Sequence, residues 1–294
     1  MPELPEVEGY LEGLRSHVVG QRLEAVRLAS PFLLRSVEPP LDAAVGDVLI
    51  GARRIGKRIV FAWSGGTFWV LHPMIAGRLR WKGKEAKLGG KAALAAFDME
   101  GGSLVLTEQG SKRRASLFVV GDEAGLAGHD PGGVEPLEVD AATLAAALAD
   151  PPRTLKRALC DPHQVSGIGN GWSDEILFTA RLSPFLRTAE LGADRAEVLW
   201  RATQDVLTAA RDRHVAAARL AFPDRVTAFQ PEMHVHGRFR EPCHVCEAPI
   251  QRIVRSSSEF HYCPGCQTGG KLLADRALSR LLKDDWPRTL ADLE

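Results

Sequence analysis

Four of the five cysteines stand in two close pairs, Cys243-x2-Cys246 and Cys263-x2-Cys266, with sixteen residues between the pairs. In a cytoplasmic chain this spacing is typical of a structural zinc site rather than of a disulfide framework. Four thiolates around one ion leave no ligand position for a substrate. We therefore expect one structural zinc ion, with a β-hairpin between the two pairs. Cys160 stands alone, and we expect it to be a buried apolar thiol.

Length and composition place the chain among ordinary globular proteins. Its 294 residues suffice for two domains, and its apolar content of 45% and charged content of 25% are average. No run of about 18 apolar residues occurs, so we expect no transmembrane helix. The N-terminus is acidic and lacks an apolar segment, which argues against a secretory signal. A cytoplasmic location is the resulting expectation.

The charges balance, but their distribution is uneven. Lys and Arg number 37, as do Asp and Glu, yet residues 51–91 hold ten basic side chains and one acid, Glu85. Lys112, Arg113 and Arg114 follow soon after. A basic face can bind phosphates even on a neutral protein, because the local field matters. A solvated strand surface gives the same pattern, so charge alone leaves both interpretations open.

Periodicity divides the chain into a strand-rich part and a helical part. Short runs rich in Val, Leu and Phe, separated by glycine pairs, predict an antiparallel sandwich or barrel; they are 22–29, 48–55, 58–63, 67–73, 93–99, 103–108 and 115–120. A linker is expected at 128–140. Helical spacing follows in 141–161, 173–182 and 191–220, and a short amphipathic helix is expected in the tail, with Leu272, Leu273, Leu278, Leu281 and Leu282.

A glycine-rich segment lies between two of these helices. Gly167, Gly169 and Gly171 rule out a simple helix through VSGIGNGWSDE. A turn there exposes main-chain N–H groups at a helix N-terminus, which is a general way to bind phosphate. Asn170 can add an amide donor.

The opening residues MPELPEVEGY allow two interpretations. Proline and acids suit the first turn of a helix, and Val7, Leu11 and Leu14 share one stripe. Alternatively, removal of Met1 leaves Pro2 with a free secondary amine beside the Glu3 carboxylate. The opening alone leaves both possibilities open.

Several motifs together resemble the formamidopyrimidine-DNA glycosylase / endonuclease VIII family of base-excision repair enzymes. The resemblance runs in order from residue 1 to about 267. It rests on the opening 2–8, Lys57 in RRIGKRIVF, His72 and Gly77 in LHPMIAGRLR, VEPL at 134–137, Lys156, GIGN at 167–170, and the four cysteines followed by Gln267.

The resemblance implies an α+β multidomain fold. Its parts would be an N-terminal catalytic β-sandwich with a leading helix at 1–138, a helix–two-turn–helix domain at 139–230, a zinc finger at 231–267 and a C-terminal extension at 268–294. It also implies a monomer whose partner is damaged double-stranded DNA, without a membrane, and hence a nucleoid-associated cytoplasmic location.

The function implied is that of a bifunctional DNA glycosylase and AP lyase acting on oxidised or ring-opened bases. Pro2 would attack C1′ of the damaged nucleotide and form a Schiff base, and β-elimination would then cut the strand. Glu3 would move protons to the sugar ring oxygen, and Lys57 would contact phosphate and assist proton transfer. Glu6 would support the site electrostatically or be merely a helix acid; both remain open.

The resemblance also implies DNA-binding residues in both halves of the chain. Ile75, with Met74 before it, would fill the gap left by an extruded base. The DNA-binding candidates are His72, Lys91, Arg113, Arg114, Lys156, Asn170 and Arg255.

Three departures qualify the family pattern. Ser258 replaces the usual arginine of the zinc hairpin, so δ-elimination is expected to be weak or to be supplied by Arg255, with Arg252 as a further candidate. Ile75 replaces a methionine and Ala115 a phenylalanine, and an alanine cannot wedge against a base. The segment 221–233 lacks a long lesion-capping loop, so 8-oxoguanine specificity is not carried over. These departures keep open a catalytically weak protein that binds lesions or abasic sites.

Overall fold

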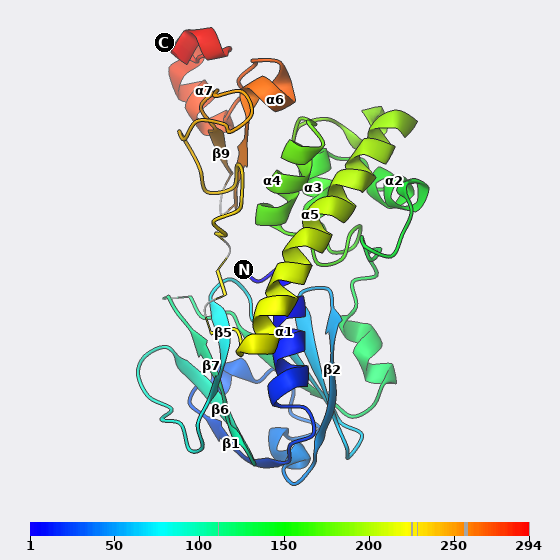
Figure 1. Cartoon of the computed structure of the whole chain (residues 1–294), viewed down its shortest axis with the longest axis vertical. Helices are drawn as coiled ribbons and strands as arrows, with labels where there is room; N and C mark the ends of the chain where they lie inside the picture. Colours follow the sequence, from blue (N-terminus) through cyan, green and yellow to red (C-terminus); the bar gives the residue numbers. More distant parts are fainter. Residues whose placement is uncertain (111, 225, 228, 256–257, 294) are drawn as a thin grey trace. The chain divides into compact units, whose positions relative to one another are not determined.

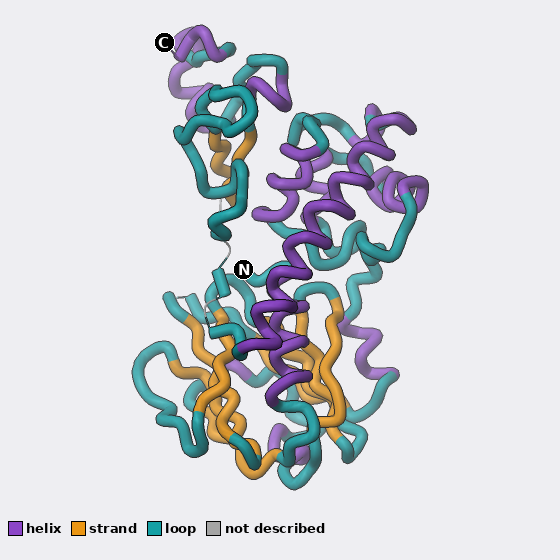
Figure 2. Tube along the Cα trace, viewed as in Figure 1, coloured by secondary structure: helices purple, strands orange, loops and turns teal. Residues whose placement is uncertain are grey.

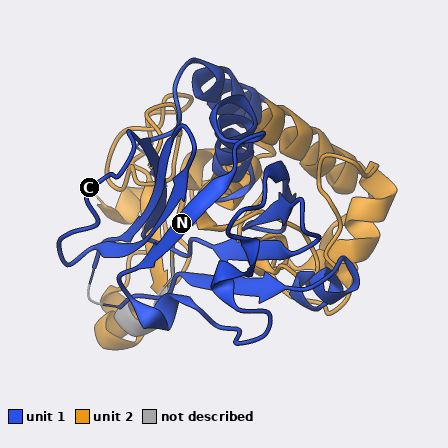
Figure 3. Ribbon diagram, turned by 90° about the horizontal axis from the view of Figure 1, so that it is seen from below, with its two compact units in different colours: residues 1–131, 209–228 blue, residues 132–208, 229–294 orange. Residues whose placement is uncertain are grey.

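The computed structural model describes residues 1–110, 112–224, 226–227, 229–255 and 258–293, without the side chains of 255, 258 and 276–278. The chain divides into two compact units (Figure 3). The first comprises 1–131 and 209–228, and the second 132–208 and 229–294. The predicted domain boundaries remain predictions. None of the helices in the described ranges combines the length and apolarity needed to cross a membrane.

The first unit begins with helix α1, Leu4–His17, whose first turn contains Pro5. Val7, Leu11 and Leu14 are all buried, which confirms the predicted apolar stripe. The helix lies beside β2 (Figure 1). Its buried face joins a core that also contains Trp63, Trp69 and Phe97 from the strands.

Two antiparallel four-stranded sheets, whose strands are orange in Figure 2, form most of the first unit, which also contains the last part of α5, Gly192–Leu220. One has the order β1-β6-β7-β5, with β1 at Leu23–Leu28, β6 at Ala93–Met99, β7 at Gly102–Glu108 and β5 at Gly77–Lys82. The other has the order β2-β3-β4-β8, with β2 at Leu49–Ile55, β3 at Arg58–Trp63, β4 at Phe68–His72 and β8 at Ser116–Val120. Short 3₁₀ segments occur at Pro31–Leu33, Leu41–Ala44 and Ala124–His129.

Every predicted strand is present, and β5 is an additional one. Its inward positions, including Gly77 and Leu79, are buried, whereas Arg78 and Arg80 are half-buried on the other face. Because strand side chains alternate between faces, this is a half-buried edge strand. Arg78 and Arg80 therefore lie on a face of the sheet rather than in a loop.

The second unit is mainly helical. It contains α2 at Ala141–Ala149, α3 at Leu155–Cys160, α4 at Asn170–Thr179, a 3₁₀ turn at Thr188–Glu190 and the first part of α5, Gly192–Leu220. Asp140 caps α2 by accepting the Thr143 N–H at 2.8 Å. Pro151 and Pro152 separate α2 from α3, because proline cannot continue a helix.

The predicted hairpin between the cysteine pairs is formed by β9, Gln251–Arg255, and β10, Ser258–Tyr262, and α6, Pro264–Thr268, follows it. The tail helix α7 is shorter than expected, Arg276–Leu282, and begins after Leu272 and Leu273. Two short 3₁₀ turns follow, at Lys283–Asp285 and Leu290–Leu293.

The C-terminal extension packs on the hairpin. The Leu273 N–H donates to the Tyr262 hydroxyl at 2.7 Å, and Asp275 accepts the Val254 N–H at 3.0 Å. The Leu273 side chain packs against the cluster that includes Phe260. These contacts brace one face of the hairpin.

Candidate active site and nucleic-acid-binding residues

The two glutamates of the opening motif are linked through the start of α1. Glu6 Oε2 accepts the main-chain N–H of Glu3 at 2.8 Å, and both side chains are buried. This satisfies a donor that a helix N-terminus otherwise leaves unpaired. His214 Nε2 lies 3.5 Å from the other Glu6 oxygen. Pro2, also buried, directly precedes this pair.

Charged groups surround the first amine of the chain, which here belongs to Met1. Burial lowers the pKa of this amine, Arg78 and Lys57 lower it further, and Glu3 and Glu6 oppose them. An amine in such surroundings is more often neutral at physiological pH, and a neutral amine is the nucleophilic form. In this chain the Pro2 nitrogen is an amide, so nucleophilic chemistry at Pro2 requires removal of Met1.

Lys57 and His72 lie on the same sheet of the first unit. Lys57 occupies the β2–β3 turn after Gly56, whose φ is +59°. His72 ends β4, and its Nδ1 accepts the Met74 N–H at 3.0 Å. Burial lowers the pKa of His72 to about 4, with Arg58 and Lys57 adding to the effect. Because Nδ1 acts as an acceptor, the neutral ring carries its proton on Nε2. The Nε2–H group can donate a hydrogen bond to a phosphate oxygen.

The loop 73–76, between β4 and β5, is held at several points. Gly77 N–H donates to Pro73 O at 2.9 Å, and Arg78 Nη1 donates to Ile75 O at 3.1 Å. A Cβ at Gly77 would lie only 2.1 Å from Pro73 O, so glycine is required there. The Ile75 side chain is 61% exposed, whereas Met74 is half-buried and has a φ of +56°.

Sequence reasoning missed Arg78 and His214. Arg78 was counted only as one of the basic residues of 51–91, although it influences the pKa of the first amine. Its position directly after Gly77, at the start of an alternating strand, was the available signal. His214 comes from α5, far along the chain, and no local pattern pairs it with Glu6.

Lys156 does not present its ammonium group for the predicted phosphate contact. It is 4% exposed, and Nζ donates to Asn170 O at 2.7 Å, to Ser173 Oγ at 2.9 Å and to Asp174 Oδ1. An ammonium has three N–H donors, and these acceptors use all three. Lys156 is thus a buried lysine whose ammonium group holds the start of α4.

Asn170 opens α4 after Gly169, and its side chain is half-buried. Together with the glycine turn before it, the start of α4 at Asn170 places main-chain N–H groups at the helix N-terminus.

The expectation that Cys160 is a buried apolar thiol is wrong. Cys160 is only partly buried, and its Sγ lies 3.1 Å from Ser173 Oγ and 3.7 Å from Asn170 Oδ1.

Two buried acids of α4 hold the segments around the hairpin. Glu175 accepts three consecutive main-chain N–H groups, from His234, Val235 and His236, at 2.7, 3.0 and 2.8 Å. Asp174 accepts the His261 N–H of β10 at 3.0 Å and lies 2.8 Å from His236 Nδ1.

Asp174, His236 and His261 could geometrically hold a metal ion. Burial alone would raise the pKa of Asp174, but the Lys156 ammonium and the two histidines lower it below its ordinary value. The ammonium already compensates the carboxylate, so the cluster is a poor cation site.

The four paired cysteines do converge. Their Sγ atoms all lie within 4.8 Å of one another, with Cys246–Cys263 at 3.3 Å and Cys243–Cys266 at 3.9 Å. A tetrahedral zinc ion with Zn–S bonds of about 2.3 Å requires sulfurs about 3.8 Å apart. The donor set therefore fits one metal ion, in agreement with the predicted ligands.

Comparisons with known proteins agree with these features. The formamidopyrimidine-DNA glycosylase N-terminal domain matches residues 1–116, and the H2TH domain of the same enzyme matches 132–219. A formamidopyrimidine-DNA glycosylase of Thermus thermophilus is 34% identical over 278 residues, covering 92% of this chain and 100% of that protein.

The chain belongs to the formamidopyrimidine-DNA glycosylase family.

Solved structures support the same fold. The crystal structure of the MutM (Fpg) protein from Thermus thermophilus is 30% identical and aligns with a TM-score of 0.75 over 90% of this chain and 98% of that one. A Lactococcus lactis Fpg variant bound to DNA containing Fapy-dG aligns with a TM-score of 0.80 at 23% identity, over 91% and 100% of the two chains. The predicted fold class is confirmed, and membership supports the predicted enzyme class, a DNA glycosylase.

The structure describes several of the residues at which the sequence departs from the family pattern. Ala115 is buried in the core of the first unit, so its methyl group faces inward. Arg113, Arg114 and Lys91 are exposed. The side chains of Arg255 and Ser258 lie outside the described part of the structure, so the expectation for Arg255 stays a prediction. Arg252 is paired with Glu259 at 3.1 Å and lies over the Phe239 ring.

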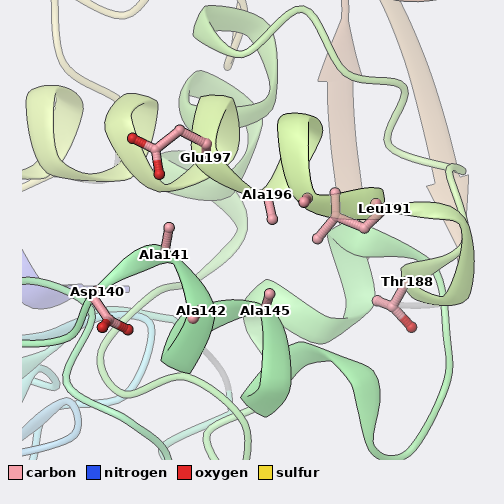
Figure 4. A pocket seen from close by; sticks show the side chains of 10 residues that line it. Asp140, Ala141, Ala142, Ala145, Thr188, Leu191, Ala196 and Glu197 are labelled. Atoms are coloured by element: carbon pink, nitrogen blue, oxygen red, sulfur yellow. The ribbon is translucent and has the colours of Figure 1, made fainter.

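A pocket of about 570 Å³ opens between the starts of α2 and α5 in the second unit (Figure 4). Alanines and Leu191 line most of it, and Asp140 and Glu197 contribute carboxylates. Both acids have partners, Thr143 N–H and Arg201 respectively. None of the predicted site residues is among those described as lining it.

Proposed function

We propose that this chain is a bifunctional DNA glycosylase and AP lyase that removes oxidised or ring-opened bases from double-stranded DNA. One observation carries the proposal. Pro2 is buried directly before the linked pair Glu3 and Glu6, and the Met1 amine next to it has a pKa lowered by burial, with Arg78 and Lys57 adding to the effect. Family membership supports the base-removal step, and the amine environment supports the lyase step.

In the proposed reaction, the Pro2 nitrogen, freed by removal of Met1, attacks C1′ of the damaged nucleotide. The bond between C1′ and the base breaks, and the base leaves with a proton. Glu3 protonates the sugar ring oxygen, so that the ring opens to a cationic iminium. Because Pro2 is a secondary amine, this adduct keeps its positive charge and acidifies the C2′ protons.

Loss of a C2′ proton then breaks the bond between C3′ and its phosphate oxygen, which cuts the strand. Water finally hydrolyses the iminium and releases Pro2. In this scheme Lys57 binds phosphate near the lesion and assists proton transfer, and Glu6 holds Glu3 through its main-chain N–H. Asn170, His72, Lys91, Arg113, Arg114 and Arg255 are proposed phosphate or strand contacts, and Lys156 acts indirectly by fixing Asn170.

We propose zinc as the metal of the four cysteines. Zinc takes four tetrahedral sulfur ligands without redox chemistry, and its role here would be structural. It would fix the base of the hairpin. Glu175 also anchors the segment before the hairpin, through the main-chain N–H groups of residues 234–236.

Trapping with borohydride tests the proposal. Protein freed of Met1, as verified by intact mass, should become covalently linked to DNA with an abasic site, because borohydride reduces a Schiff base to a stable amine. The same processed protein with its N-terminal nitrogen acylated is the matched control and should not be trapped. Binding to abasic DNA without trapping by the processed protein would favour the alternative, a lesion-binding protein without efficient cleavage.

A further inference from the structure

A shielded ion pair joins α1 to the strand that leads to Lys57. Glu8, in the second turn of α1, accepts a hydrogen bond from Arg54 Nε of β2 at 3.1 Å. The Arg54 side chain is 10% exposed and that of Glu8 is 23% exposed. Salt screens such a pair much less than a surface pair, so the two side chains hold one geometry. Neither residue has a step in the proposed reaction.

The same guanidinium also holds the turn between β2 and β3. Arg54 Nη1 donates to Gly56 O at 2.8 Å. Because the guanidinium is planar and its N–H groups point in fixed directions, these two hydrogen bonds set the position of the Gly56 carbonyl relative to α1. That carbonyl belongs to the planar peptide unit that Gly56 shares with Lys57. Arg54 therefore fixes the main chain from which the Lys57 side chain extends.

The pair connects two parts of the proposed active site. Helix α1 begins at Leu4, directly after Pro2 and Glu3. Lys57 is among the charges that act on the Met1 amine, so its side chain lies within electrostatic range of the opening residues. One end of the ion pair thus belongs to the helix that supports the nucleophile, and the other end holds the turn that carries Lys57.

The preceding arginine of β2 has different surroundings. Successive strand side chains point to opposite faces, so Arg53 lies on the face opposite to Arg54. Arg53 pairs with Glu123, and both side chains are more than half exposed. An exposed pair of this kind contributes little to stability. The two neighbouring arginines therefore provide a test pair and a matched control pair within the same strand.

We propose that Glu8 and Arg54 are positioning residues for Lys57. Their ion pair, together with the hydrogen bond from Arg54 to Gly56, sets the place of the Lys57 ammonium relative to the start of α1, where it binds a phosphate of the damaged strand. The inference deepens the proposed function and rests on it for the ligand, DNA with an abasic site, and for the phosphate contact of Lys57.

Binding measurements with the whole chain test this without requiring catalysis. The probe is a duplex with one tetrahydrofuran abasic analogue, titrated over a range of salt concentrations. Glu8→Ala removes the acid of the shielded pair from a helix, where alanine is well tolerated, and Glu123→Ala removes the acid of the exposed pair. Arg54→Lys keeps the charge but places its donors on one nitrogen, which cannot span both acceptors. Lys57→Ala, alone and combined with Glu8→Ala, completes a double-mutant cycle.

Simple electrostatics and the proposed positioning predict opposite results. Deleting an acid removes repulsion between the protein and phosphates, so Glu123→Ala should bind equally well or slightly more tightly. Glu8→Ala and Arg54→Lys should instead bind at least about threefold more weakly, the scale of one phosphate contact. The slope of log K against log salt should fall in magnitude by up to about 1, as for Lys57→Ala. In the Lys57→Ala background, Glu8→Ala should change the Kd by less than about twofold, because the group that it positions is already gone.

The outcomes separate this inference from the proposed function. Wild-type affinity in Lys57→Ala or Arg54→Lys, or unchanged or tighter binding by Glu8→Ala, overturns the inference even if borohydride trapping succeeds. Equal weakening by Glu8→Ala with and without Lys57 also overturns it, because that marks a purely structural role. If Glu8→Ala does not fold, Arg54→Lys takes its place in the cycle. Failure of trapping with the expected cycle would overturn the lyase proposal and leave the inference standing.

Discussion

Glu6 accepts the main-chain N–H of Glu3 across the first turn of α1, at 2.8 Å. The acid proposed to protonate the sugar is thus held by a second buried acid three residues later. This explains how a short N-terminal segment can be rigid enough for chemistry, because the helix start itself is the support.

Two substitutions of Glu6 separate its charge from its hydrogen bond. Glu6→Gln keeps an acceptor for the Glu3 N–H, as glutamine does in capping boxes, but removes the negative charge. We expect near-wild-type stability but trapping slowed by about tenfold, which corresponds to about 1.4 kcal/mol in the barrier. Glu6→Ala should in addition lose about 0.5–2 kcal/mol of stability. A wild-type trapping rate for Glu6→Gln would reduce Glu6 to a helix-capping residue.

His72 should make stability depend on pH. Its folded-state pKa of about 4 lies below the ordinary value of 6.5. Between these values the unfolded chain binds more protons, so the stabilising contribution is complete above about pH 6.5 and is lost as pH falls toward 4.

The variant His72→Asn tests this. Asparagine retains an acceptor near the position of Nδ1 but does not titrate. Melting temperatures measured from about pH 4 to 7 should rise less steeply with pH for His72→Asn than for the wild-type chain. Parallel curves would mean that His72 is not the titrating group.

Lys156 should affect stability without acting as a phosphate contact. Lys156→Met leaves Asp174 buried without its ammonium, and breaking a buried pair in this way costs about 3–5 kcal/mol. The slope of log K against log salt for DNA binding should not change, whereas a lost phosphate contact reduces its magnitude by about 1. Denaturant unfolding and salt titration of the folded variant provide the two measurements.

Gly77 should be intolerant of any side chain. Gly77→Ala places a methyl carbon 2.1 Å from Pro73 O, so the loop that carries Ile75 must move. We expect a loss of about 1–3 kcal/mol, as for other overpacked sites, with weaker binding of abasic duplexes. Gly51→Ala in β2 is the matched control, since its Cβ would meet nothing within 4 Å. Similar losses in both variants would point to a general strand effect.

Metal content should follow the paired cysteines alone. Cys263→Ser should lose the single zinc ion that elemental analysis is expected to find in the wild-type protein, and its hairpin should become sensitive to protease. Cys160→Ser should keep both the metal and the protease resistance, because Cys160 lies outside the cluster. Zinc retained at full occupancy in Cys263→Ser would contradict the proposed ligand set.

Local patterns predicted most of the fold, because alternation and glycine pairs are properties of neighbouring residues. Strand β5 is not evident from the sequence, because its outward positions carry the charged residues Arg78, Arg80 and Lys82 and only Gly77 and Leu79 are buried. The cysteine ligands were predictable because metal spacing is likewise local.

The candidate site was harder to predict where partners are distant. Lys156 lies in a short helix, and the sequence does not reveal that its acceptors on Asn170, Ser173 and Asp174 surround the ammonium. Arg54 is equally ordinary in sequence, and only the structure shows that its guanidinium binds both Glu8 of α1 and the Gly56 carbonyl.

The buried position of Pro2 bears on how the protein is produced. Any purification tag, protease scar or fusion partner upstream would leave the ring nitrogen acylated. A recombinant sample of this kind could fold, bind metal and bind DNA normally, and still look like an inert member of its family. Maturation by methionine aminopeptidase would then be the step that turns the translated chain into a catalyst.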